Sequence, residues 1–394
     1  MQESINLTFC DEYGYPQQIK DQIEDIVTIF RKSDNIKSII LSGSAARGEL
    51  SYKKGNDALT IFSDYEFFLV TDKKYSLEEQ ARLNASLSEY EHGIRKNSPL
   101  FKIDYSYTIQ NRLSRLPKII RNFELKQNGK TLWGHDYISN VPDISIKDLD
   151  YRDLNSIIYK RLWHVLDHLP DDLQFDNDEE NLKYILCRNI LDLTTIILPY
   201  QGILLPTYRR RIEWICGNFI RFPLFQEYFT LNLVDWLKMA LAGKERVHFN
   251  IDSLELYKIF VRSFEGITAY LSASGQFGLN EWPRERHELK NIFKGFQLIK
   301  YQKGIGRSLS WLILPKKKLF QDLLFALHKA LLAREFNREW KGPILLSKMK
   351  LELLHPLFSL AEEPSFPARW LGLRDGARSF WNAYLWGIYD AAWH

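Results

Sequence analysis

At 394 residues the chain is too long for one ordinary hydrophobic core, so two or three domains are expected. Hydrophobic residues make up 45% of the chain and charged residues 26%, a composition that excludes an intrinsically disordered protein. The 53 basic residues barely outnumber the 49 acidic ones, so the composition indicates no extended basic surface and a nucleic-acid partner is not expected.

Targeting signals are not expected from the sequence. Residues 1–17 contain neither a basic region nor an apolar run, so we expect no signal peptide. The most apolar stretch, Tyr184–Leu198, is interrupted by Arg188 and Asp192, and we therefore expect no membrane span. The three cysteines lie far apart, which favours a reducing compartment over a disulfide framework. Together these features predict a cytoplasmic protein.

The first third of the chain alternates between helical and strand patterns. Apolar residues at helical spacing predict a helix over Ile19–Phe30. Strands are predicted at Lys37–Ser42, Ser63–Val70 and Phe101–Ile109. A helix between the last two strands is predicted to begin at Ser76, because a glutamate three positions later is typical of a capping box. This order indicates an α/β or α+β domain.

Beyond Pro142 the pattern is helical almost to the end of the chain. Apolar residues recur at helical spacing over Leu154–Leu169 and Leu182–Ile197, and later segments are separated by prolines. A break near Leu241–Val247 divides this part into two predicted helical units. The sequence therefore predicts a large all-helical region after the first domain.

Two carboxylates, Asp64 and Glu66, follow Ser63 at the start of the second predicted strand. They point together, because residues i and i+2 of a strand project from the same face. Such a pair repels unless a cation compensates it, and Mg²⁺ favours carboxylates together with substrate phosphates. Asp104 lies on the polar face of the third strand, and three such acids can hold two ions about 3.5–4 Å apart. The alternative is a polar edge strand that exposes its acids to water.

A Gly-Ser turn, Gly43-Ser44, follows the first predicted strand and opens a helix. Glycine permits close backbone approach, and the N–H groups at a helix start favour a phosphate. Arg47, one turn further, is placed to bind a phosphate oxygen. Its alternative role is a surface ion pair with Glu49.

These segments resemble a known superfamily. Gly43–Glu49 (GSAARGE) followed by Ser63–Glu66 (SDYE) resembles the signature of the DNA polymerase β-like nucleotidyltransferases, especially minimal members and kanamycin-type aminoglycoside nucleotidyltransferases. Asn128–Pro142 is similar to the strand that closes the catalytic domain in these proteins. The resemblance covers residues 17–145.

The resemblance implies an α+β fold whose small mixed sheet is flanked by helices. It implies a catalytic domain at 1–147, a helical domain at 148–243 that walls the acceptor site, and a C-terminal helical region at 244–394. The implied site comprises the catalytic and metal-binding acids Asp64, Glu66 and Asp104 and the nucleotide-binding residues Gly43, Ser44, Arg47 and Ser63.

The implied activity is Mg²⁺-dependent transfer of a nucleoside monophosphate, with two ions, to a hydroxyl of a small molecule or protein. ATP is the expected donor and pyrophosphate the leaving group. One alternative is a non-catalytic nucleotide-binding or interaction module on the same fold. Another is a protein-modifying, AMPylating transferase of the toxin–antitoxin type. The sequence carries no signal for an oligomeric state.

The helical region offers weaker candidates. Within Arg209–Arg211 one arginine is a candidate triphosphate ligand, but a solvated helix face is the favoured interpretation. Asp192 is a candidate general base, but a structural ion pair with Arg188 is favoured. Aromatic residues near the C-terminus are candidates for stacking on a sugar or base, although a packed core is favoured. They are Trp370, Phe380, Trp381, Tyr384, Trp386, Tyr389 and Trp393.

Overall fold

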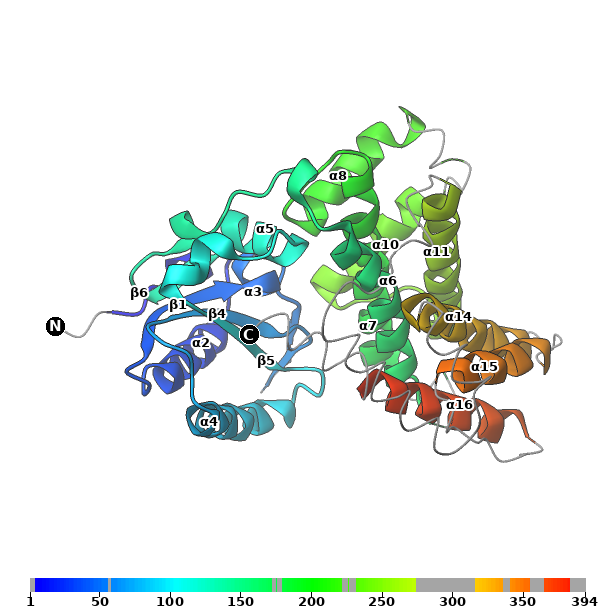
Figure 1. The fold of residues 1–394 in the computed structure, drawn as a ribbon, viewed down its shortest axis with the longest axis horizontal. Helices are drawn as coiled ribbons and strands as arrows, with labels where there is room; N and C mark the ends of the chain where they lie inside the picture. The colour runs from blue at the N-terminus through cyan, green and yellow to red at the C-terminus, as the bar shows by residue number, and fades with distance from the viewer. Residues whose placement is uncertain are drawn as a thin grey trace, which may run out of the picture.

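A sheet domain is followed by a larger helical region (Figure 1). The computed structural model describes residues 4–55, 58–171, 175, 179–221, 226, 232–273, 316–335, 341–354 and 365–382. Tyr384, Trp386, Tyr389 and Trp393, which we considered for stacking, lie outside the described residues. Among the described helices none has both the length and the apolar character that crossing a bilayer requires.

The domain is built on a four-stranded mixed sheet in the order β5-β4-β1-β6. Strand β4 pairs antiparallel with β1 and parallel with β5, and β1 pairs antiparallel with β6. The three predicted strands and the closing strand are therefore all present in one small mixed sheet, as predicted. Their bounds are β1 Ile36–Ser42, β4 Tyr65–Thr71, β5 Ile103–Ile109 and β6 Lys130–Gly134.

Helices cover both faces of this sheet (Figure 1). Helices α2 (Gln17–Phe30) and α4 (Leu77–Arg95) lie on one face and α5 (Ile120–Asn128) on the other. Alternate residues of each strand enter opposite faces, so Phe67 joins the core under α2 while Phe68 joins the core under α5. The predicted capping box at the start of α4 is confirmed. The shorter helical elements of the domain are α1 Thr8–Glu12, α3 Gly43–Ala46, η1 Gln110–Arg115, η2 Ile138–Asn140 and η3 Ile146–Asp148.

A small hairpin that the sequence did not predict lies between β1 and β4. It consists of β2 (Tyr52–Lys54) and β3 (Leu59–Ile61), which pair antiparallel. Its Lys53 Nζ lies 2.5 Å from a carboxylate oxygen of Glu180 in the helical region. The hairpin therefore links the sheet domain to the helices at the protein surface.

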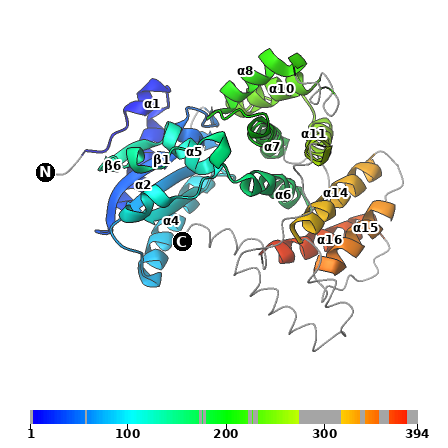
Figure 2. The same cartoon turned by 45° about the horizontal axis from the view of Figure 1, so that its top comes forward.

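The helical region is organised around α6 and α7, which lie between the sheet domain and α14–α16 (Figures 1 and 2). One hydrophobic core extends from α6 to α16 among the described residues. The predicted boundary at residue 243 lies within α10, which ends at Arg246. The helices are α6 Tyr151–His168, α7 Glu179–Tyr200, α8 Tyr208–Asn218, η4 Phe219–Arg221, α10 Asn232–Arg246, α11 Ser253–Ala273, α14 Lys316–Glu335, α15 Lys341–Leu354 and α16 Phe366–Phe380.

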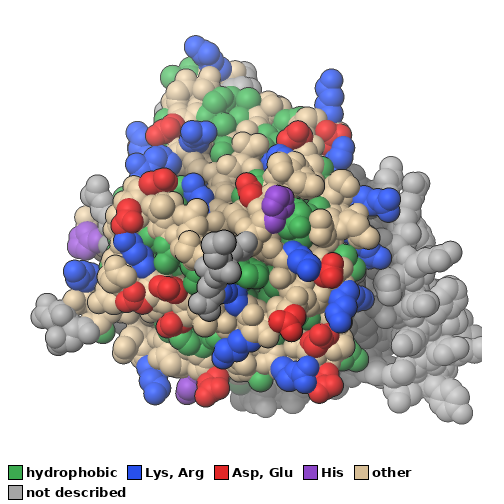
Figure 3. Space-filling model, turned by 90° about the vertical axis from the view of Figure 1, so that its left-hand side faces the viewer, with side chains coloured by type: hydrophobic (Ala, Val, Ile, Leu, Met, Phe, Trp, Pro, Cys, Tyr) green, Lys and Arg blue, Asp and Glu red, His purple; other side chains and the backbone are tan. Residues whose placement is uncertain are grey.

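The face of the sheet domain that looks away from the helices carries mixed charge. Lysine and arginine side chains alternate with aspartate and glutamate over this face, and neither sign gathers into a broad patch on the part of the described surface in view (Figure 3). Such a surface supplies no one-signed field for a polyanion.

Candidate active site

A cavity of about 410 Å³ lies between the sheet domain and the helices. The sheet domain contributes all three predicted acids together with Ser44, Arg47 and Ser63, and Gly43 lies beside it against Glu66. The helical region contributes a second set of polar side chains. This set comprises Asp153, Lys160, Arg161, Tyr184, Arg188, Asp192, Thr195, Tyr208 and Lys244.

The sheet register brings the acids together. Parallel pairing of β4 with β5 sets Glu66 directly beside Asp104, and Asp64 precedes the start of β4 by one residue. Asp104 is exposed to the cavity, and the surrounding protein atoms shield it in part from bulk water. This desolvation, together with repulsion from Asp64 and Glu66, raises the pKa of Asp104 to about 6. The three side chains therefore form a concentration of negative charge.

Two arginines face these acids. Nη1 of Arg188 on α7 donates to Oδ2 of Asp64 at 3.2 Å, and Nη2 of Arg121 on α5 lies 3.7 Å from Oε2 of Glu66. With the side chains in these positions, no group of three acidic, histidine or cysteine side chains among the described residues converges to hold a metal ion. In donor chemistry the acids fit Mg²⁺, because carboxylate oxygens are its preferred protein ligands. Desolvation is the main cause of the raised pKa of Asp104, and repulsion from Asp64 and Glu66, which a cation would relieve, adds to it.

Gly43 allows the Gly-Ser turn to approach the acids closely. Its φ of +67° lies in the left-handed region, which favours glycine. A Cβ at this position would lie 2.5 Å from Oε1 of Glu66, so a larger residue would push that carboxylate away. Ser44, the next residue, lines the cavity at the start of α3. The turn and Glu66 are therefore packed as a unit.

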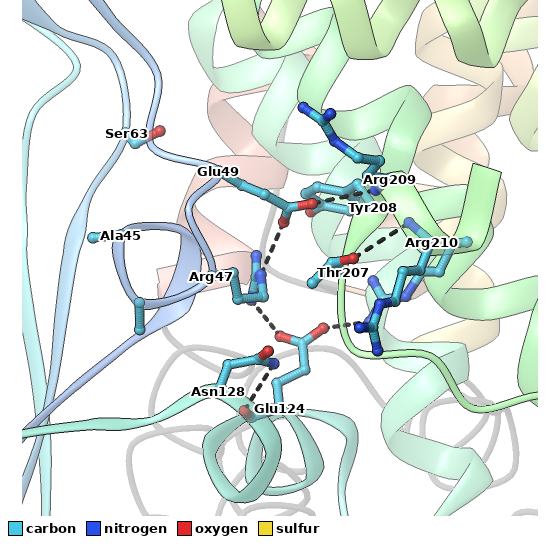
Figure 4. Close-up of polar contacts among 12 residues, drawn as sticks. Ala45, Arg47, Glu49, Ser63, Glu124, Asn128, Thr207, Tyr208, Arg209 and Arg210 are labelled. Carbon is cyan, nitrogen blue, oxygen red and sulfur yellow. Dashed lines mark hydrogen bonds and ion pairs between the residues drawn. The ribbon is translucent and has the colours of Figure 1, made fainter. Parts of the chain in front are cut away.

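Arg47 lies at the boundary between the sheet domain and α8 (Figure 4). Its Nε donates to Oε2 of Glu49 at 2.9 Å and its Nη1 to Oε2 of Glu124 at 2.7 Å. The ion pair with Glu49, which we considered as a surface contact, is therefore present but buried. Burial opposes the charged form of Arg47, but the two carboxylates outweigh it and raise its pKa above the usual value.

The hydroxyl of Ser63 has two protein partners. It accepts a hydrogen bond from the backbone N of Ser51 at 3.1 Å and lies 2.9 Å from the hydroxyl of Tyr184. Ser63 thus joins the start of β4 to α7 as well as lining the cavity.

One face of α7 forms much of the helical wall. Tyr184, Arg188, Asp192 and Thr195 all line the cavity, and they follow one another at intervals of three or four residues, the helical repeat. The sequence contained this signal, because these polar residues form a stripe along an otherwise apolar helix. We considered Asp192 and Arg188 as a pair but did not identify the stripe that they form with Tyr184 and Thr195.

The predicted ion pair between Asp192 and Arg188 was wrong. Asp192 pairs with Arg161, whose Nε lies 2.5 Å from Oδ2, and accepts a hydrogen bond of 2.6 Å from the hydroxyl of Tyr208. It does not pair with Arg188, because Asp64 from the sheet domain occupies that arginine.

Arg211 is buried, so the favoured interpretation of a solvated helix face was wrong for this member of the arginine cluster. It donates to Glu124 at 2.5 Å and to the hydroxyl of Thr195 at 2.6 Å. Arg209, in contrast, pairs at the surface with Glu245. Glu124 therefore joins Arg47 of the sheet domain to Arg211 of α8.

Another part of the cavity lining is apolar and aromatic. It includes Ile119, Ile120, Ile157 and Trp381, and the last of these directly follows α16. The Trp381 ring stacks on that of Trp163, with centroids 6.0 Å apart and an interplanar angle of 24°. The prediction of a packed core for these aromatics holds for Trp381, which is nonetheless part of the cavity wall.

No family model and no curated protein matches the chain. Among solved structures, the chain is similar to spectinomycin adenyltransferase AAD(9) from Enterococcus faecialis, whose structure was determined with ATP and spectinomycin. The match covers 62% of this chain and 98% of that chain, with 19% sequence identity and a TM-score of 0.36.

Proposed function

We propose that the protein is a Mg²⁺-dependent nucleotidyltransferase that moves a nucleoside monophosphate, with AMP expected, from an NTP to a hydroxyl group. The observation that carries this proposal is the alignment of Glu66 beside Asp104, with Asp64, in a cavity closed by a polar face of α7. Clustered carboxylates on adjacent strands are the ligand set that metal-assisted phosphoryl chemistry uses.

The sheet domain would bind the donor. Asp64, Glu66 and Asp104 would hold Mg²⁺, which when bound supplies charge neutralisation at the phosphates and lowers the pKa of a coordinated hydroxyl. Gly43 and Ser44 would bring backbone N–H groups close to the phosphates. In the reaction the acceptor oxygen forms a bond to the α-phosphorus. The bond between the α-phosphorus and the oxygen that bridges it to the β-phosphorus breaks, and pyrophosphate leaves with that oxygen. The acceptor proton passes to a carboxylate or to water.

The helical region would bind the acceptor, which we propose is a hydroxylated small molecule or a protein side chain. Ile157 and Trp381 of the helical region, together with Ile119 and Ile120 of the adjoining sheet domain, provide an apolar surface for the non-reacting part of an acceptor. Asp192, held by Arg161 and Tyr208, adds a fixed hydrogen-bond acceptor to the same cavity.

Pyrophosphate release from the full-length protein tests this function. The protein is incubated with Mg²⁺ and each labelled NTP, alone and with a panel of hydroxylated acceptors. We expect release with at least one pair and loss of release in Asp64→Asn/Glu66→Gln. The matched control is Asp143→Asn/Glu78→Gln, which neutralises two exposed carboxylates outside the cavity and should leave release unchanged. Equal activity of the Asp64→Asn/Glu66→Gln variant would contradict the proposed metal site.

A second candidate is a non-catalytic nucleotide-binding module. The ion pairs of Asp64 with Arg188 and of Glu66 with Arg121 favour it, because both acids already have cationic partners within the protein. Saturable NTP binding without pyrophosphate release across the whole acceptor panel would support this function over the first.

A further inference from the structure

The partner of Asp64 comes from the opposite wall of the cavity. Arg188 lies on α7, 124 residues away along the chain, and donates to Oδ2 of Asp64 at 3.2 Å. Only 22% of the arginine side chain and 14% of the aspartate side chain are exposed. This contact joins the first proposed metal ligand to the helical wall.

Arg188 and a divalent cation would compete for Asp64. A carboxylate that binds both cations would hold two positive charges side by side, which costs free energy in a partly desolvated site. Loss of the arginine contact is tolerable only if the guanidinium finds another anion. The phosphates of a nucleotide are such an anion, and a guanidinium binds them with two parallel hydrogen bonds.

Other arginines of the cavity are held differently. Arg47 is fixed between Glu49 and Glu124, and Arg161 is paired with Asp192. Arg121 faces Glu66, but at 3.7 Å the contact is longer than a hydrogen bond. Arg188 therefore combines a direct hydrogen bond to a proposed metal ligand with a place on the wall opposite the acids.

We propose that Arg188 is an internal counter-ion of Asp64, which a divalent metal ion displaces, and that the released guanidinium then binds the phosphates of the nucleotide. Arg188 is thus a positioning residue that couples metal binding by the sheet domain to nucleotide binding by the helical wall. This inference rests on the proposed function, which supplies the metal and the NTP.

Two binding measurements on the full-length protein test the exchange. The first is a Mn²⁺ titration without nucleotide, followed by electron paramagnetic resonance of the free ion. We expect Arg188→Gln to bind Mn²⁺ roughly threefold or more tightly than wild type, because the competing cation is gone. The second is calorimetric binding of α,β-methylene-ATP at saturating Mn²⁺. Here we expect Arg188→Gln to bind roughly tenfold more weakly, since a charged hydrogen-bond donor is lost.

Two further variants separate the proposal from a general structural effect. Lys53→Gln removes an exposed ion pair between the sheet domain and α7 and should change neither measurement. Arg188→Lys keeps the charge, so its Mn²⁺ affinity should stay near that of wild type even if Arg188→Gln folds poorly. Its affinity for the analogue should fall, because lysine lacks the two-pronged donor geometry.

The proposal is overturned if Arg188→Gln binds Mn²⁺ no more tightly than wild type, or if the analogue binds equally well to both at saturating Mn²⁺. Failure of the proposed function has a different signature. Wild-type protein would then release no pyrophosphate with any pair of NTP and acceptor, whereas failure of the inference alone leaves pyrophosphate release by the wild type intact.

Discussion

Gly43 and Glu66 occupy space that cannot accommodate one further carbon atom without movement of the carboxylate. A Cβ at position 43 would lie 2.5 Å from Oε1 of Glu66 and 2.6 Å from its Cδ. The obstructing atoms are the flexible end of a side chain rather than backbone. A substitution at Gly43 is therefore expected to displace Glu66 more than it distorts the sheet.

Gly43→Ala should selectively impair metal binding. Alanine at a φ of +67° is strained, which should lower the free energy of unfolding by about 1 kcal/mol. The new methyl group also displaces Glu66. Gly14→Ala is the matched control, since Gly14 has the same φ of +67° and an added Cβ would contact nothing within 4 Å. Chemical denaturation should show similar losses for both variants, while Mn²⁺ affinity should fall only in Gly43→Ala. Equal Mn²⁺ affinities of the two variants would show that the Gly-Ser turn does not influence metal binding by the acids.

Asp104→Asn should stabilise the protein at neutral pH. The folded-state pKa of about 6 lies above the ordinary value of 3.8, so charged Asp104 destabilises the fold at pH above about 6. That penalty diminishes as the pH falls through the interval between the two values, because the native state then takes up the proton first. Thermal unfolding from pH 4 to 8 should show a higher Tm for Asp104→Asn at pH 7.5 and a diminishing difference toward pH 4. A Tm difference that stays constant across this pH range would contradict the raised pKa of Asp104 as the cause of the stabilisation.

The same pKa predicts how metal binding depends on pH. Protonated Asp104 is a poor ligand, so Mn²⁺ affinity of the wild type should fall as the pH drops through about 6. In Asp104→Asn this step should be absent and the affinity lower at pH 7.5. Titrations at several pH values measure both effects, and an unchanged step in the variant would assign it to another group.

Glu124→Gln should destabilise the fold strongly. Glu124 compensates Arg47 and Arg211, whose side chains are only 9% and 3% exposed. Removing its charge takes one anionic partner from each of two buried arginines, which should lower the free energy of unfolding by about 3 kcal/mol. Glu245→Gln is the control, because its partner Arg209 is 63% exposed and such surface pairs contribute under about 1 kcal/mol. Urea denaturation compares the two variants, and equal shifts would contradict a structural role for the buried network.

Trp381→Leu should weaken binding of the acceptor and leave the donor site intact. The ring lines the cavity and stacks on Trp163, so the substitution removes a flat apolar surface. We expect the KM for the acceptor to rise by up to roughly tenfold. Arg378→Gln, which breaks an exposed contact of α16 with Asp167, is the control. Steady-state kinetics with an acceptor found by pyrophosphate release provides the KM, and calorimetry provides the affinity for α,β-methylene-ATP. A parallel loss of analogue affinity would place Trp381 at the donor end.

Local patterns predicted the sheet and part of the cavity. A β-branched run, an apolar run after Ser63 and the alternation over Phe101–Ile109 predicted three strands, with Asp64 and Glu66 at the start of one and Asp104 on another. In the structure β4 begins at Tyr65, so Asp64 directly precedes the strand. The adjacency of these acids depends on the parallel pairing of β4 with β5, which the local sequence patterns do not specify. The hairpin of β2 and β3 was missed because its strands are only three residues long and show little alternation.

Long-range ion pairs could not be predicted in the same way. For Asp192, the sequence suggested the nearest cation at helical spacing, Arg188, but the fold supplied a competing carboxylate from Asp64. Arg211 was assigned to solvent because three consecutive arginines usually are, yet α8 buries one of them against Glu124. In both cases the partner lies on another element, and only the packing of the sheet domain against the helices decides the pairing.

The hydrophobic core of the helical region includes Phe62, Ile120 and Phe123 from the sheet domain. Separating the two walls of the cavity as rigid bodies would therefore expose apolar surface as well as the buried network around Glu124. Hinge opening is disfavoured in a molecule joined in this way. We therefore expect ligands to reach the cavity without separation of its two walls.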